Sequence, residues 1–204
     1  AHIPQDEYGY AETLLTAIIL TSILLRLGLG EALVRFWFDD EDPERRRRLA
    51  RSATGWTFTA TTAAAAVALA LAGPLSEALL ATRDATLLAC GVLGLWAFTN
   101  LEIAYALLRV EERRATYLRA SCVNVLLTVA LTVTLVVGLD GGARGYVLGN
   151  YAASTVVLLA LWWSQRERVA LRPPGRPALR ALTRFGAPTV PAALRGSVAT
   201  LAPA

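Results

Sequence analysis

The hydrophobic pattern divides the chain into long apolar runs separated by short charged segments. The first run continues from Thr13 to Phe38, and the twelve residues from Leu14 to Leu25 carry no charge. Four further runs cover residues 49–72, 85–108, 117–138 and 146–163. A helix needs about 20 predominantly apolar residues to cross a bilayer, and each run is close to this length. The pattern therefore predicts an all-α, multi-span helical membrane protein with about five complete transmembrane helices.

An arginine interrupts the first run. We expect Tyr10 to Phe38 to form one helix about 43 Å long, with Arg26 near the middle of the membrane. A charge at this depth costs about 2.5–3.5 kcal/mol on insertion scales, so it needs a watery cavity or an anionic partner. Ser22 and Gly30 lie on the same stripe of this helix. Arg26 is therefore predicted to bind an anionic ligand, to pair with Glu31 or with a carboxylate of another helix, or to snorkel towards the membrane surface.

Polar residues also lie inside the later runs. Asn100 and Glu102 occupy the second half of the third run, and Glu102 precedes Arg109 by seven residues. Asn124 begins a polar stripe that repeats every four residues along the fourth run. Such residues either form interhelical hydrogen bonds or line a cavity. Glu102 is either an acid neutralised by basic neighbours or a substrate or proton site.

Small residues and helix breakers predict packing and turns. Gly149 and Ala153 form a small-xxx-small pair that favours close helix approach. Pro43 fits the first turn of the second helix. We expect this helix to end at Gly73-Pro74 and residues 74–85 to form a short connection. The sequence LDGGARG predicts a tight turn with glycines at positive φ.

The basic residues alternate between the two ends of the predicted helices. The loops at 39–51, 109–119 and 164–184 carry 15 arginines, whereas the N-terminal segment and the turns at 73–84 and 139–145 carry 2. Cytoplasmic loops of membrane proteins carry the excess of positive charge. The three basic loops are therefore predicted to be cytoplasmic and Ala1 external. Because all 20 basic residues are arginine in an alanine-rich chain, we expect a GC-rich bacterial genome.

Several classes of function find little support in the sequence. Its one histidine lies in the N-terminal segment, and no His, Cys or carboxylate cluster has metal-ligand spacing. A Gly-rich phosphate loop and a nucleophile elbow are absent, so we expect neither an enzyme nor a cofactor. Acidic residues offset the arginine run at 45–48, and no aromatic residues are interleaved with it, so nucleic acid is not an expected partner.

Four segments carry a family resemblance: EYGYAETL, LGLGEALVRFWF, NLEIAYALLRVEERRATY and RFGAPTVPAAL. In this order and spacing they resemble the polysaccharide-biosynthesis flippases of the multidrug/oligosaccharidyl-lipid/polysaccharide (MOP) exporter superfamily, over residues 5–194. The resemblance implies two lobes of helices around a central cavity. Residues 1–165 would be the N-terminal lobe without its first helix, 166–184 a basic cytoplasmic linker, and 185–204 the start of the C-terminal lobe. The chain is accordingly expected to be a fragment.

The resemblance implies movement of undecaprenyl-diphosphate-linked oligosaccharides from the inner to the outer leaflet of the bacterial cytoplasmic membrane. We expect alternating access as the mechanism. Arg35 matches the family's arginine at the cytoplasmic end of its helix, whereas Arg26 and Glu31 match no motif and are inferred from charge and depth. The predicted substrate-binding residues are Arg26, Glu31, Arg35, Asn100, Glu102 and Asn124.

The expected partners are membrane lipid, the lipid-linked oligosaccharide and a coupling cation, either a proton or sodium, acting through Glu12 or Glu102. Two alternatives stay open. One is a drug/cation antiporter of the same superfamily, and the other is a non-transport assembly subunit of a cell-envelope complex.

Overall fold

Every element in the described part of the chain is a helix. The computed structural model describes residues 5–26, 29–39, 41–80 and 84–170, and no strand occurs among them. The elements are α1 (Gln5–Arg26), α2 (Leu29–Asp39), α3 (Pro43–Ala70), α4 (Ala72–Leu80), α5 (Ala85–Val110), α6 (Arg114–Val133), the π-helical turn η1 (Thr134–Gly138) and α7 (Gly142–Ser164). The all-α class is confirmed. The predicted start of a second lobe, at 185–204, lies outside the described residues, as do residues 171–184 of the linker.

The helices account for the predicted membrane spans. Four described stretches are long and apolar enough to cross a membrane: Gly9–Arg26, Ala85–Val110, Arg114–Gly138 and Gly142–Ser164. α3 and α4 meet the same criteria together, although the chain bends by 88° between them. The described residues thus contain four spans, or five if the bent pair is one span, in agreement with the five apolar runs.

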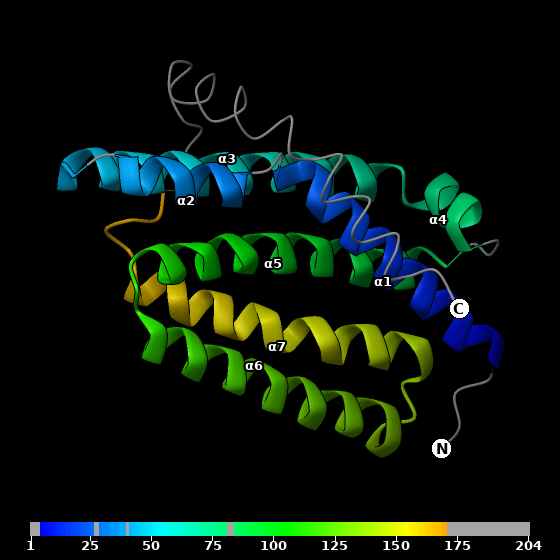
Figure 1. Ribbon diagram of the computed structural model, residues 1–204. Helices are drawn as coiled ribbons and strands as arrows, with labels where there is room; N and C mark the ends of the chain where they lie inside the picture. Colours follow the sequence, from blue (N-terminus) through cyan, green and yellow to red (C-terminus); the bar gives the residue numbers. More distant parts are fainter. Residues whose placement is uncertain (1–4, 27–28, 40, 81–83, 171–204) are drawn as a thin grey trace, which may run out of the picture.

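The first apolar run forms two helices, so the single helix predicted from Tyr10 to Phe38 is wrong. α1 ends at Arg26 and α2 begins at Leu29, and the two run in different directions (Figure 1). Gly28 and Gly30 occur at this point of the sequence, and glycine inside a helix costs up to about 1 kcal/mol relative to alanine. Arg26 therefore lies in the last turn of α1, where a positive charge interacts favourably with the helix dipole.

The second apolar run bends before its proline. α3 begins at Pro43 as predicted, with the Asp42 carboxylate accepting a hydrogen bond from a backbone amide of the first turn. The helix ends at Ala70, and α4 continues through Gly73-Pro74. Pro74 lies in the first turn of α4, where a missing N–H leaves no intrahelical bond unmade. The connection expected at 74–85 is thus partly a helix.

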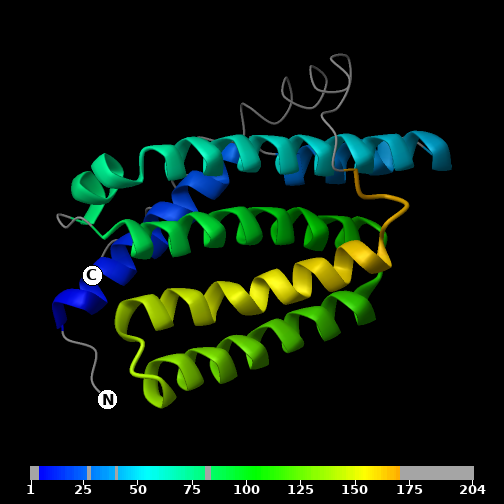
Figure 2. The same cartoon turned by 180° about the vertical axis from the view of Figure 1, so that it is seen from behind.

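α5 is the central helix of the bundle. It packs between α3 and α7, while α1 crosses one face of this layer and α6 lies beyond α7 at the edge (Figures 1 and 2). Of the 26 residues of α5, 18 are buried, whereas none of α6 is buried. Most valine and leucine side chains of α6 are exposed, as expected for a helix that borders hydrocarbon, whereas Leu127 packs against α5 and α7.

Close packing of α6 against α7 depends on glycine. A Cβ atom at Gly149 would lie 2.6 Å from Thr132 Cα, and one at Gly145 would lie 3.0 Å from the Leu135 carbonyl oxygen. The predicted close approach at Gly149 is confirmed. Gly142 begins α7 with a φ of 54°, so the tight turn also uses a glycine at positive φ, as predicted.

Candidate functional site

Arg26 and Glu102 form an ion pair between α1 and α5. Arg26 Nη1 lies 3.2 Å from Glu102 Oε2, and 24% and 28% of the two side chains remain exposed. The Arg26 Nε also donates to the Ser22 carbonyl oxygen one turn earlier, at 3.4 Å. Glu102 lies about 12 Å along the helix axis from the end of α5, well inside the candidate span. The arginine thus has an anionic partner from another helix, which was one of the alternatives predicted from the sequence.

The two helices that carry this pair also carry buried polar groups without partners. The hydroxyl of Ser22, one turn before Arg26, is fully buried, and so is the hydroxyl of Tyr105, whose ring packs against the Tyr117 ring of α6. Among the described residues neither hydroxyl has a hydrogen-bond partner. Buried polar groups are normally hydrogen-bonded, so these two hydroxyls offer hydrogen-bonding capacity to a water or a ligand. Tyr105 was not predicted, because a tyrosine in an apolar run is equally typical of a packed core.

Glu102 does not pair with Arg109. The guanidinium of Arg109 instead lies over the Tyr117 ring, 6.0 Å from its centroid. The interpretation of Glu102 as an interfacial acid neutralised by its basic neighbour is therefore corrected, since the neutralising charge is that of Arg26.

Asn100 faces a different helix from Glu102. Its amide nitrogen donates to Thr61 Oγ1 of α3 at 2.9 Å and to the Trp96 carbonyl oxygen at 2.8 Å, and the residue is 3% exposed. Residues two apart on a helix point about 200° apart. Asn100 therefore joins α5 to α3, and the structure does not bring it to the Arg26–Glu102 pair.

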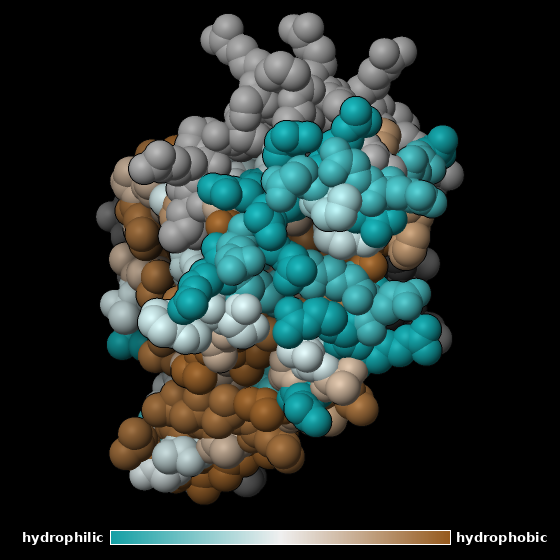
Figure 3. All heavy atoms as spheres, turned by 90° about the vertical axis from the view of Figure 1, so that its left-hand side faces the viewer, coloured by the Kyte–Doolittle hydropathy of each residue, from teal (hydrophilic) through white to brown (hydrophobic). Residues whose placement is uncertain are grey.

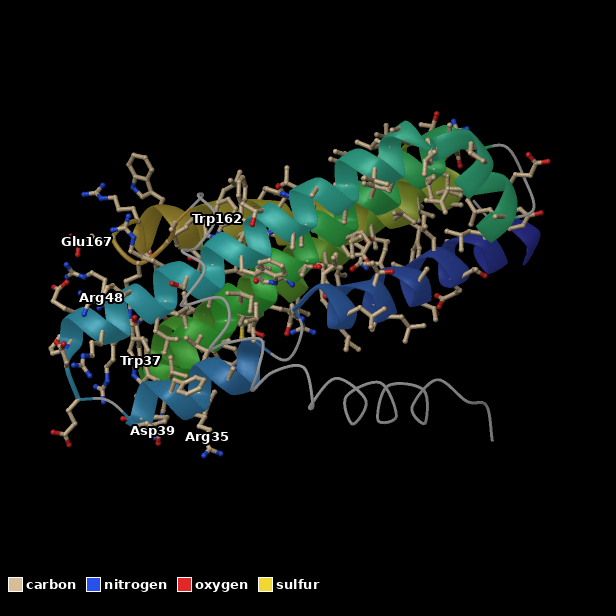
Figure 4. All side chains as sticks on the ribbon, turned by 90° about the horizontal axis from the view of Figure 1, so that it is seen from above. Arg35, Trp37, Asp39, Arg48, Trp162 and Glu167 are labelled. Atoms are coloured by element: carbon tan, nitrogen blue, oxygen red, sulfur yellow. The ribbon has the colours of Figure 1, made fainter. Side chains whose placement is uncertain are left out.

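The other predicted residues lie on separate surfaces. Arg35 is exposed on α2, where its Nε lies 3.9 Å from the Asp39 carboxylate, and Figure 4 shows it pointing away from the neighbouring helices. Asn124 is half-buried on α6, and its buried Oδ1 has no hydrogen-bond partner among the described residues. The side chain of Glu31 lies outside the description. Only Arg26 and Glu102, of the described candidates, are in direct contact.

A second set of charges lies at the opposite end of the span from Arg109. The Asp84 carboxylate caps α5 by accepting from the Leu87 amide at 2.9 Å, and it binds Arg144 of α7 through contacts of 3.0–3.3 Å. Burial raises the pKa of Asp84, but the hydrogen bonds from Leu87 and Arg144 outweigh it and the net pKa is lowered. Nearby, the Tyr146 hydroxyl donates to Glu12 at 3.5 Å.

No metal centre is formed by the part of the chain that the structure describes. Groups of three or more His, Cys, Asp or Glu side chains close enough to hold an ion are absent there.

The fold matches that of known membrane transporters. A multidrug resistance MATE family transporter of the MOP superfamily, in an outward-facing conformation, superimposes with a TM-score of 0.75 and 17% identity over 98% of this chain and 48% of its own. A MOP superfamily transporter from Pyrococcus furiosus gives a TM-score of 0.74 and 18% identity over 96% of this chain and 46% of its own. The chain therefore spans about half the length of these transporters, which share its fold.

The sequence identifies the family of the chain. Residues 3–200 match the family of polysaccharide biosynthesis proteins, and the chain belongs to this family. No curated protein matches the sequence. The family links the chain to polysaccharide biosynthesis, and the two solved structures show that it shares the fold of transporters.

Proposed function

We propose that the full-length protein moves lipid-linked oligosaccharides, with an undecaprenyl-diphosphate carrier, across the bacterial cytoplasmic membrane. The family supports a part in polysaccharide biosynthesis, and the fold supports transport. The observation that carries the proposal is the partly exposed ion pair between Arg26, at the end of one candidate span, and Glu102, inside another. Arginine offers a planar fork of donors that matches phosphate oxygens, and a diphosphate is the charged part of this substrate.

The pair suits reversible binding of an anion. A diphosphate offers more acceptor oxygens and more negative charge than one carboxylate, so it competes with Glu102 for the Arg26 guanidinium. Before substrate arrives, Glu102 keeps the arginine from being an uncompensated charge in the membrane. When substrate binds, Arg26 exchanges one anionic partner for another, while the polyprenyl tail stays in lipid.

Glu102 also provides a route for coupling to a cation. Once the diphosphate has displaced it, the carboxylate faces the site without its arginine, and a proton or sodium ion then neutralises it. Release of that cation returns Glu102 to Arg26 and expels the substrate. Glu12, which accepts a hydrogen bond from Tyr146, is the second acid placed for such a role.

The proposed transport cycle needs two lobes. We assign residues 1–165 to the N-terminal lobe, 166–184 to a cytoplasmic linker and 185–204 to the start of the second lobe. The lobes rock about the shared cavity, which opens alternately to each side. In the orientation proposed from the arginine distribution, the end of α5 at Val110 faces the cytoplasm and the end at Asp84 faces outward.

A drug/cation antiporter is the second candidate, because a multidrug resistance transporter shares the fold and Glu102 is an acid inside the spans. The two candidates differ in which member of the pair contacts the substrate. An anionic head engages Arg26, whereas a cationic drug engages Glu102.

Export of lipid-linked oligosaccharide by the full-length protein tests the proposal. Arg26→Gln is expected to lose nearly all export and Arg26→Lys about tenfold, because lysine lacks the fork. The exposed Arg45→Gln is the matched control and keeps export. A purely structural pair predicts another pattern: Arg26→Gln combined with Glu102→Gln removes both charges and would restore export. Wild-type export by this double variant at normal membrane levels would overturn the proposal.

A further inference from the structure

A pocket of about 420 Å³ lies at the end of the molecule where the charged segments meet. Its walls come from α2, α3, the turn between α5 and α6, and the segment after α7. Figure 3 views this end, where hydrophilic residues gather across the upper part and hydrophobic residues below them. The pocket begins next to Glu111, about 13 Å along α5 from Glu102, so it is separate from the proposed transport site.

Three arginines from three segments line the pocket. Arg168 Nε lies 2.7 Å from Glu111 Oε1, and Arg113 Nη1 lies 3.8 Å from Glu111 Oε2. Arg46 donates from Nε to the Trp37 carbonyl oxygen at 2.9 Å, and its guanidinium stacks over the Trp37 ring. Such convergence of guanidinium groups is typical of sites that bind phosphate.

Glu111 is the anion that pairs with Arg113 and Arg168 in this pocket. Its side chain is 6% exposed, and neither carboxylate oxygen accepts a hydrogen bond of good geometry among the described residues. Burial raises the pKa of Glu111, although Arg168 and Arg113 oppose this effect. A buried carboxylate that makes ion pairs without satisfied hydrogen bonds is a poor partner for two arginines. A phosphate group offers tetrahedral oxygens that satisfy the guanidinium donors better.

The position of the pocket identifies the source of the phosphate. Val110, the last residue of the candidate span in α5, is part of the lining, so the pocket lies at the level where a membrane meets water. Trp37 and Phe38 supply an apolar wall, and Phe38 is 59% exposed. An anionic lipid can contact both surfaces, because its phosphate binds the guanidinium groups while its apolar part packs against the apolar wall. Free phosphate makes no favourable contact with the apolar wall.

We propose that the pocket lined by Arg46, Arg113 and Arg168 binds the phosphate of an anionic lipid headgroup, with Glu111 as the internal anion that the lipid displaces. The proposal does not depend on which substrate the protein transports. It predicts opposite effects for two neighbouring residues. Removal of an arginine weakens lipid binding, whereas removal of the Glu111 charge strengthens it.

The test uses the purified full-length protein in nanodiscs of phosphatidylcholine with a minor fraction of fluorescent phosphatidylglycerol. Arg113→Gln and Arg168→Gln are each expected to weaken lipid retention by about tenfold, as expected for loss of a hydrogen bond to a charged group. The control Arg114→Gln changes an exposed arginine of the same turn and leaves retention unchanged. Glu111→Gln, which keeps the shape of the side chain, increases retention several-fold.

Competition with inorganic phosphate separates the two sources. The lipid proposal predicts that phosphate at the same concentration displaces little of the phosphatidylglycerol, because phosphate makes no contact with the apolar wall. Full displacement would show a site for free phosphate instead. Equal retention by wild type, Arg113→Gln and Arg168→Gln, or weaker retention by Glu111→Gln, would overturn the proposal. Thermal unfolding of each variant without the anionic lipid shows whether a loss of lipid retention reflects misfolding. If an arginine variant is misfolded, Arg168→Lys is measured in its place.

Discussion

Glu102 pairs with Arg26, which is 76 residues away in the sequence, and not with Arg109 on the next turns of its own helix. The contact ties the end of α1 to the middle of α5, the most buried helix of the described chain. Each charge therefore has a partner where lipid offers none. The same contact leaves both side chains partly exposed, and the proposed function uses this exposure for an exchange of partners.

Asn100 is expected to matter for stability more than for transport. Asn100→Ala removes the hydrogen bonds to Thr61 and Trp96 and should destabilise the protein by about 1–3 kcal/mol. Thermal unfolding in detergent measures this loss. At matched membrane levels, export should stay close to wild type. Thr61→Val, which removes the acceptor on α3, should also lower stability. A large export defect in a stable Asn100→Ala protein would instead show that Asn100 contributes to the substrate site.

Gly149 should tolerate no side chain. Gly149→Ala places a Cβ atom 2.6 Å from the backbone of α6, so the two helices must separate. We expect a loss of about 1–3 kcal/mol, comparable with overpacking of a core. Gly73→Ala is the matched control, because nothing lies within 4 Å of its added Cβ. The glycine contact is not essential if both variants unfold at the wild-type temperature.

Hydropathy predicted the helices but not their bends. The apolar runs predicted the spans because each must cover the hydrocarbon thickness, whichever direction it takes. The chain bends by 88° between α3, which ends at Ala70, and α4, which begins at Ala72. Leu71 and Ala72 at this bend are as apolar as the helix before it. Nothing in the hydropathy pattern therefore marked this change of direction. Pro74 did mark a local feature, but proline is equally compatible with the start of a helix.

The candidate site could be predicted only as separate residues. Arg26 and Glu102 each interrupt a long apolar stretch, which indicated that both needed a partner. Their pairing follows from the crossing of α1 over α5, and one sequence carries no signal for that crossing. Asn100 looked equivalent to Glu102 in the sequence, but a separation of two residues places them on opposite sides of α5.

The two ends of the molecule should respond to pH in opposite directions. The pKa of Asp84 is lowered below its ordinary value of 3.8, so its contribution to stability is present above that value and is lost as pH falls through the folded-state pKa. The pKa of Glu111 is raised above 4.5, so its contribution is present below 4.5 and is lost as pH rises through the folded-state pKa. At neutral pH, Asp84→Asn should therefore unfold at a lower temperature than wild type, and Glu111→Gln at a higher one.

A pH series of thermal unfolding curves checks both directions. The deficit of Asp84→Asn should shrink under acidic conditions, and the gain of Glu111→Gln should disappear below about pH 4.5. The exposed Glu41→Gln serves as the control and should follow wild type throughout. A destabilised Glu111→Gln protein at neutral pH would show that the ion pairs with Arg113 and Arg168 outweigh the cost of burial.

Labelling of single cysteines tests the proposed orientation. Cys90 and Cys122 are replaced first, and a cysteine is then placed at Leu139 or at Glu44, both of which are exposed. A reagent that cannot cross the membrane should label intact cells at position 139 and not at position 44, because the arginine-rich ends are expected in the cytoplasm. Permeabilised cells should be labelled at both positions. Labelling of intact cells at position 44 alone would reverse the orientation.

Direct binding of undecaprenyl diphosphate to the purified full-length protein tests the central claim, namely that Arg26 exchanges Glu102 for the substrate phosphates. Arg26→Gln should weaken binding by at least about tenfold, the loss expected when a charge-assisted hydrogen bond to phosphate is removed. Glu102→Gln should strengthen binding, because the competing carboxylate is gone. The account is contradicted if a folded Arg26→Gln protein binds the lipid as tightly as wild type, or if Glu102→Gln weakens binding of the lipid and abolishes binding of a cationic drug.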